Sequence, residues 1–182
     1  MQKKLLTLVL MLIAAINTFA YDFESNGIYY KILSKEKHTC AVTYQSETSS
    51  KEYAGNLVIP STVQDNDGVD YTVSAISDYA FGGCVELQNV VIPNTVTEIG
   101  DNAFGGCSSL SNITFQSGHK ELYLSDHNRQ GPLFAECSLD SVFIGRNFNL
   151  RPHCLGEGNR VEHFSDFGGF CSTFGVARPG FE

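Results

Sequence analysis

Three cysteines occupy the same place in a short repeated motif, and their thiols are the groups in this chain that first suggest chemistry. Cys84, Cys107 and Cys137 each follow a phenylalanine by three residues. Stacked parallel strands bring equivalent residues to within about 5 Å of one another, which is within reach of a disulfide. A buried cysteine also packs well as a small apolar side chain. We favour a ladder of free thiols inside the core over a Cys84–Cys107 bridge. The sequence assigns no partner to the other three cysteines, Cys40, Cys154 and Cys171.

Two sets of side chains have the types that metal ions prefer. The zinc candidates are His153, Cys154, His163 and Cys171. Structural zinc ligands usually come as one pair spaced by two to four residues and another spaced by three to five, which this set lacks. The calcium candidates are Asp65, Asp67 and Asp70, but their spacing misses the EF-hand loop and no distal glutamate completes it. A solvated turn explains them better, and we expect no metal and no cofactor.

The sequence contains no recognisable catalytic arrangement of nucleophile and base. Asp126 and His127 are adjacent, but nothing in the spacing places them beside a nucleophile. Residues 156–158 read Gly-Glu-Gly, without the third glycine and the preceding strand of a dinucleotide site. We therefore predict that the protein is not an enzyme and has no catalytic residues.

Internal repetition accounts for the cysteine spacing. Residues 80–84 read Ala-Phe-Gly-Gly-Cys, and the same string recurs at residues 103–107, 23 positions later. Apolar positions match at the same offset: Ile76 with Ile99, Leu87 with Leu110, Val90 with Ile113, and Ile92 with Phe115. A fixed period of 20 to 30 residues is typical of a solenoid, in which each unit buries its apolar side against its neighbours. A weaker third copy spans residues 132–145, after an insertion at residues 120–131 that we interpret as a surface loop.

Strand alternation separates the inward from the outward side chains of a repeat. In residues 87–92, Leu87, Val90 and Ile92 should point inward, and the residues between them outward. Stacking brings the outward positions of successive repeats into one continuous surface. The candidate recognition residues on that surface are Asn89, Val91, Asn112, Thr114, Ser141 and Phe143.

The repeat reads Ile-x-x-x-Ala-Phe-x-Gly-Cys-x-x-Leu-x-x-Val-x-Ile-Pro-x-x-Val and resembles the BspA-type leucine-rich repeat family of bacterial surface and secreted proteins. The resemblance covers residues 53–147. It implies a mainly β, short curved leucine-rich-repeat solenoid with one short parallel strand per repeat. It also implies adhesion, through binding of host matrix proteins, other bacteria or surface glycans, and it brings no shared catalytic residues.

Residues 1–20 are predicted to be a signal peptide. Lys3 and Lys4 precede an apolar run at residues 5–16, and small residues stand at the −3 and −1 positions of a cut after Ala20. The run is too short to span a bilayer, so we expect secretion or surface location without membrane insertion after cleavage.

Residues 21–52 should form an N-terminal β cap, with a hairpin from residues 28–33 and 40–44. A second hairpin turn is expected at Asp65-Asn66-Asp67-Gly68.

The repeat pattern ends at Asn147, and residues 148–182 are expected to be a non-repeat tail, which is truncated, frame-shifted or disordered.

The formal net charge of −8 argues against nucleic acid as a partner, because binding it requires many Lys and Arg contacts to phosphate. The expected partner is a host or bacterial surface protein or a glycan. The alternatives are a structural cell-envelope module or a fragment of a longer array without its own ligand. A hydrolase of surface polymers is the least supported function.

Overall fold

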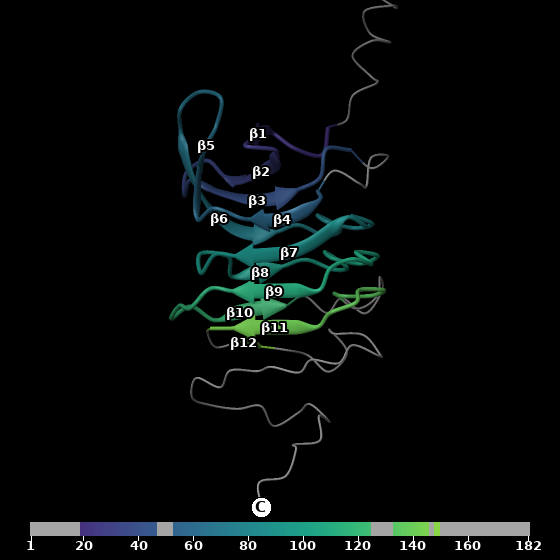
Figure 1. Cartoon of the computed structure of the whole chain (residues 1–182). Coiled ribbons are helices and arrows are strands. Elements are labelled where there is room, and N and C mark those ends of the chain that lie inside the picture. Colours follow the sequence, from purple (N-terminus) through teal and green to yellow (C-terminus); the bar gives the residue numbers. More distant parts are fainter. Residues whose placement is uncertain (1–18, 47–52, 125–132, 146–147, 150–182) are drawn as a thin grey trace, which may run out of the picture.

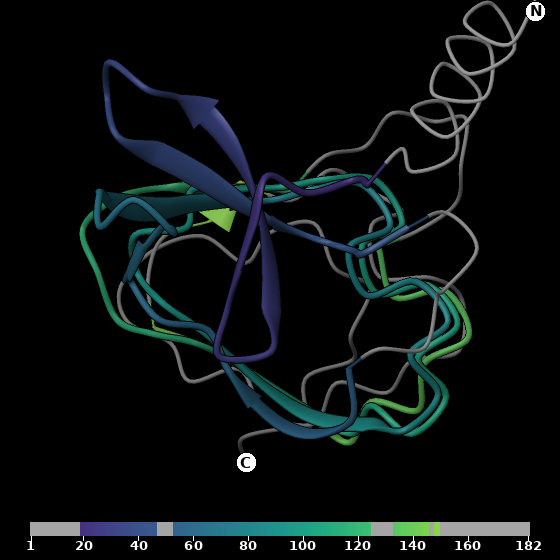
Figure 2. The ribbon, with the colours of Figure 1, turned by 90° about the horizontal axis from the view of Figure 1, so that it is seen from above.

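Two sheets stand on opposite sides of a stack of coils, and each coil of chain adds strands to them (Figures 1 and 2). The computed structural model describes residues 19–46, 53–124, 133–145 and 148–149. In these ranges no helix is long and apolar enough to cross a bilayer. The predicted mainly β repeat solenoid is confirmed.

The four-stranded sheet contains the strand that the repeat pattern predicts. Its order is β11-β9-β7-β4, and all its pairings are parallel. The strands are β4 (Gly55–Val58), β7 (Leu87–Ile92), β9 (Asn112–Phe115) and β11 (Ser141–Ile144). Leu87, Val90 and Ile92 are at most 1% exposed, so the predicted inward register is confirmed.

The eight-stranded sheet runs along the opposite side of the stack. Its order is β1-β2-β3-β6-β8-β10-β12, and β5 pairs with β6 off this path. The strands are β1 (Phe23–Ser25), β2 (Ile28–Ser34), β3 (Thr39–Thr43), β5 (Thr62–Gln64), β6 (Asp70–Ile76), β8 (Glu98–Ile99), β10 (Leu122–Leu124) and β12 (Phe148–Asn149). A coil of the solenoid therefore contributes a second strand, in the eight-stranded sheet, besides the single strand per repeat that the sequence predicted. These second strands are two or three residues long in β8, β10 and β12, too short to show alternation in the sequence.

The insertion at residues 120–131 is not wholly a surface loop. β10 lies within it and pairs in parallel with both β8 and β12, and the Leu122 side chain is fully buried. Through β12, the sheet also continues into the first residues of the segment expected to be a non-repeat tail.

Aromatic rings form a stack through the middle of the core. Phe81 and Phe104 are stacked with ring centroids 4.9 Å apart, and Phe104 and Phe134 with centroids 5.4 Å apart. Tyr53 takes the equivalent place one coil earlier, with its centroid 5.0 Å from Phe81. Its buried hydroxyl donates to the Thr43 carbonyl at 2.6 Å and accepts the Tyr29 N–H at 3.1 Å. The tyrosine therefore joins the repeat core to the N-terminal cap.

The glycines of the repeated motif form the turn that carries this stack. Gly83 and Gly106 have φ angles of 73° and 75°, a region that L side chains rarely adopt. The third copy places Glu136 there, with a φ of 59°. Neighbouring turns are joined by backbone hydrogen bonds, such as Phe81 N–H to Ala103 carbonyl at 2.8 Å.

Both predicted hairpins are confirmed. β2 and β3 pair antiparallel, and β3 pairs in parallel with β6, so the cap extends the sheet of the solenoid. β5 and β6 form the second hairpin, in which Asp65 N–H donates to the Val69 carbonyl at 2.9 Å and Gly68 has a φ of 81°. This hairpin projects beside the cap at the N-terminal end of the stack (Figure 1).

Candidate recognition face

The outward side chains of the four-stranded sheet lie in two rows that run along the stack. Strand register aligns each row across four coils. The polar row is Asn56, Asn89, Asn112 and Ser141, and the apolar row is Val58, Val91, Thr114 and Phe143. The structure thus brings all six sequence-predicted residues together on one face, which we call the recognition face.

Side-chain hydrogen bonds connect the whole polar row. Asn89 Nδ2 donates to Asn56 Oδ1, and Asn112 Nδ2 donates to Asn89 Oδ1 at 2.7 Å. Ser141 Oγ donates to Asn112 Oδ1 at 2.5 Å, and Asn112 Nδ2 also donates to Ser111 Oγ at 2.9 Å. Each such bond contributes about 0.5–1.5 kcal/mol to stability. The polar row is therefore a fixed ladder with a defined orientation.

The apolar row offers contact area beside that ladder. Val58 is 63% exposed and Phe143 is 39% exposed, while Val91 and Thr114 between them are half-buried. Aromatic side chains often anchor a protein partner, and Phe143 is the aromatic residue of this row.

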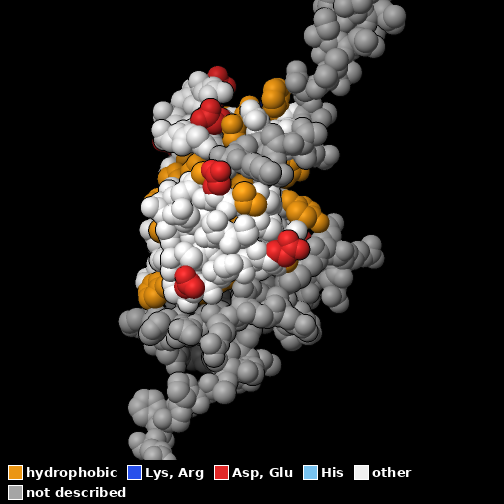
Figure 3. Space-filling model, turned by 45° about the vertical axis from the view of Figure 1, so that its right-hand side comes forward, with side chains coloured by type: hydrophobic (Ala, Val, Ile, Leu, Met, Phe, Trp, Pro, Cys, Tyr) orange, Lys and Arg blue, Asp and Glu red, His pale blue; other side chains and the backbone are white. Residues whose placement is uncertain are grey.

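Charge is absent from both rows, although the chain carries a formal net charge of −8. Figure 3 shows the side of the coils with scattered acidic side chains among mostly uncharged ones. The central parts of protein interfaces are depleted of charged residues and enriched in aromatic ones. The recognition face shares the lack of charge, and Phe143 is its one aromatic residue.

The thiol ladder is confirmed as part of the core. Cys84, Cys107 and Cys137 are all free, and the first two are buried. The Cys107 thiol donates to the Phe81 carbonyl at 3.0 Å, and the Cys137 thiol donates to the Phe104 carbonyl at 3.0 Å. The neighbouring Cys137 thiol and burial together raise the pKa of the Cys107 thiol. These thiols join one coil to the next.

The predicted hairpin turn holds the calcium candidates in place. Asp65 Oδ1 accepts the N–H groups of Asp67 and Val69, at 2.9 and 2.8 Å, and Gln64 Nε2 donates to Asp70 Oδ1 at 3.3 Å. No group of three or more potential metal ligands occurs in the part of the chain that the structure describes. The zinc candidates, Asp126, His127 and the Gly-Glu-Gly segment lie outside the described residues.

Sequence reasoning missed the first member of each row, Asn56 and Val58. The signal was present, because Asn56 precedes Asn89 by the same 33 positions that separate Pro60 from Pro93. The ten extra residues between these copies lie in the β5–β6 hairpin, and residues 56–58 still pair with residues 89–91 after a register shift between Gly55 and Asn56.

A family model described as a BspA type leucine rich repeat region matches residues 74–158 in six copies. Among solved structures, a leucine-rich repeat protein from Bacteroides ovatus ATCC 8483 is 26% identical with a TM-score of 0.48, over 71% of this chain and 38% of that one. A leucine rich cell surface protein from Faecalibacterium prausnitzii A2-165 is 25% identical with a TM-score of 0.46, over 67% of this chain and 32% of that one. This chain thus spans about a third of the length of both. No curated protein matches it.

Proposed function

Because its repeats belong to the BspA-type leucine-rich repeat family, we propose that this chain is a secreted or cell-surface binding protein that holds its partner on the recognition face. Leucine-rich repeats of this kind serve protein–protein interaction and are generally not enzymes. Export is supported by the sequence of residues 1–20, which has a positive start, an apolar run and small residues before Ala20.

The observation that carries the proposal is the pairing of a polar ladder with an uncharged apolar row. The ladder fixes the geometry of the face before binding, so little side-chain entropy is lost when a partner docks. The apolar row then supplies area to bury, with Val58 and Phe143 as its most exposed members. A host or bacterial surface protein or a surface glycan is the partner class that we propose.

Screening identifies the partner, and two matched variants locate its site. The purified protein is tested for saturable binding to matrix proteins, bacterial surface proteins and a glycan array. Phe143→Ala removes an aromatic side chain that is 39% exposed on the recognition face, and Tyr123→Ala removes one that is 54% exposed on the eight-stranded sheet. We expect Phe143→Ala to weaken binding about tenfold and Tyr123→Ala to leave it unchanged. If Tyr123→Ala weakened binding and Phe143→Ala did not, the site would lie on the eight-stranded sheet. If the screen found no saturable binding, a structural role would be favoured.

A further inference from the structure

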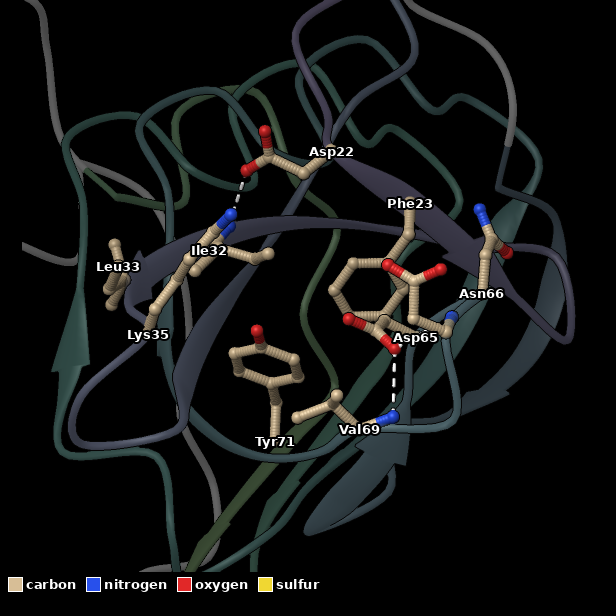
Figure 4. A pocket seen from close by; sticks show the side chains of 10 residues that line it. Asp22, Phe23, Ile32, Leu33, Lys35, Asp65, Asn66, Val69 and Tyr71 are labelled. Atoms are coloured by element: carbon tan, nitrogen blue, oxygen red, sulfur yellow. Dashed lines mark hydrogen bonds between the residues drawn. The ribbon is translucent and has the colours of Figure 1, made fainter.

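A pocket lies at the N-terminal end of the solenoid, where β1 and β2 of the cap approach the β5–β6 hairpin (Figure 4). Its volume is about 630 Å³, within the size range of sites for small organic groups. It is formed by segments of the cap and by the inserted hairpin, and it contains none of the recognition-face residues.

An unpartnered hydroxyl inside this pocket points to a ligand. Tyr71 is only 4% exposed, its ring lies 5.8 Å from that of Phe23, and its hydroxyl is directed into the pocket (Figure 4). Among the described residues, no hydrogen-bond partner occurs for this hydroxyl. Burial raises the pKa of Tyr71, and the nearby carboxylates of Asp65, Asp22 and Asp67 raise it further. The hydroxyl therefore stays neutral and can accept a hydrogen bond from a bound group.

Carboxylates dominate the charge around that hydroxyl. Asp22 Oδ2 accepts the Ile32 N–H at 2.6 Å, and Asp65 Oδ1 accepts two backbone N–H groups of the hairpin turn. These bonds fix the two carboxylates and leave one oxygen of each for a ligand. Asp67 adds a third carboxylate, and Lys35 is the only cationic side chain among the described residues that line the pocket. The pocket thus has three negative charges against one positive charge, and more acceptors than donors.

We propose that this pocket binds the cationic side chain of a partner protein, an arginine guanidinium or a lysine ammonium. A guanidinium carries five N–H donors and a full charge, which match several carboxylate oxygens and the Tyr71 hydroxyl at once. A neutral polyol would leave the excess negative charge uncompensated, and an anion would be repelled. The pocket is separate from the recognition face, so this site does not depend on the function proposed for that face.

N-acetylarginine methylamide is a suitable probe, with the citrulline analogue as a neutral control of nearly the same shape. We titrate each into the purified ¹⁵N-labelled protein and follow the amide resonances of the two hairpins. For a ligand of this size we expect a saturable shift with a Kd of about 1 mM for the arginine probe and none for the citrulline analogue. Glucose and N-acetylglutamate methylamide test a polyol and an anion.

Three variants test the role of charge and of the hydroxyl. Asp67→Asn and Tyr71→Phe should each weaken binding about threefold to tenfold, since they remove one charge and one acceptor. Lys35→Ala should tighten binding about threefold, because it removes a repelling ammonium. Phe143→Ala should change nothing. Thermal unfolding checks that each variant keeps the fold.

Four results would overturn the proposal. They are equal binding of the arginine and citrulline probes, preferential binding of glucose or of the anion, weaker binding after Lys35→Ala, and no saturable shift with the arginine probe. Each is independent of the partner screen, which reports on the recognition face.

Discussion

Replacing Phe104 by alanine removes the middle ring of the aromatic stack. The side chain is fully buried and is stacked on Phe81 on one side and Phe134 on the other. Truncation of a buried phenylalanine costs about 3–5 kcal/mol, and an aromatic pair contributes about 0.5–1.5 kcal/mol beyond its buried area. Because both pairs are lost together, we expect a loss near the upper end, about 4–5 kcal/mol of unfolding free energy.

Urea unfolding followed by circular dichroism measures this loss by linear extrapolation. Val85→Ala is the control, because Val85 lies in the preceding repeat and is 40% exposed, and it should change stability by less than about 0.5 kcal/mol. Phe104→Leu keeps most of the volume and should cost about 1.5 kcal/mol, which provides a measurable variant if the alanine protein unfolds. Equal losses for Phe104→Ala and Val85→Ala would refute the idea that the ring stack holds the coils together.

Four further changes probe other parts of the structure by the same measurement. Asn112→Ala breaks the polar ladder and should cost about 1–3 kcal/mol, whereas a loss near zero would mean that the ladder is not formed in solution. Tyr53→Phe leaves the Tyr29 N–H and Thr43 carbonyl without their partner and should cost about 1–3 kcal/mol, and a neutral result would contradict the proposed link to the cap. Gly106→Ala places a Cβ at a φ of 75° and should cost about 1–2 kcal/mol, with an unchanged midpoint as the contrary result. Burial raises the pKa of Cys40 from 9.0 to about 12, so stability should fall as pH rises through that interval, and Cys40→Ala should reduce this slope.

The repeat core was predictable because its signal is periodic. Apolar residues recur 23 positions apart, as Val90 and Ile113 do, and strand alternation then assigns the inward register. The same register brings the six predicted face residues together. The polar ladder was less visible, because an outward asparagine is ordinarily solvated, and only the pairing of strands shows that Asn112 bonds to both neighbours in its row.

The short strands of the eight-stranded sheet and the pocket could not be predicted, because their residues do not recur at the repeat spacing. β8 is a two-residue strand, and β10 lies in an insertion that interrupts the repeat. The pocket joins Asp22 of the cap to Tyr71 of β6, which are about fifty positions apart in the sequence and belong to no repeat. The order of the chain therefore gave no indication that they share a site.

Binding to the centre of the recognition face can be tested with one substitution. Thr114 lies in the apolar row between Val91 and Phe143, and it is half-buried and outside the core. Thr114→Arg adds bulk and charge there without removing a core contact. The Kd for the partner found in the screen is measured for this variant and for the unaltered protein. We predict that the Kd rises at least about tenfold while the unfolding temperature stays the same. An unchanged Kd in a folded variant would contradict recognition through this face.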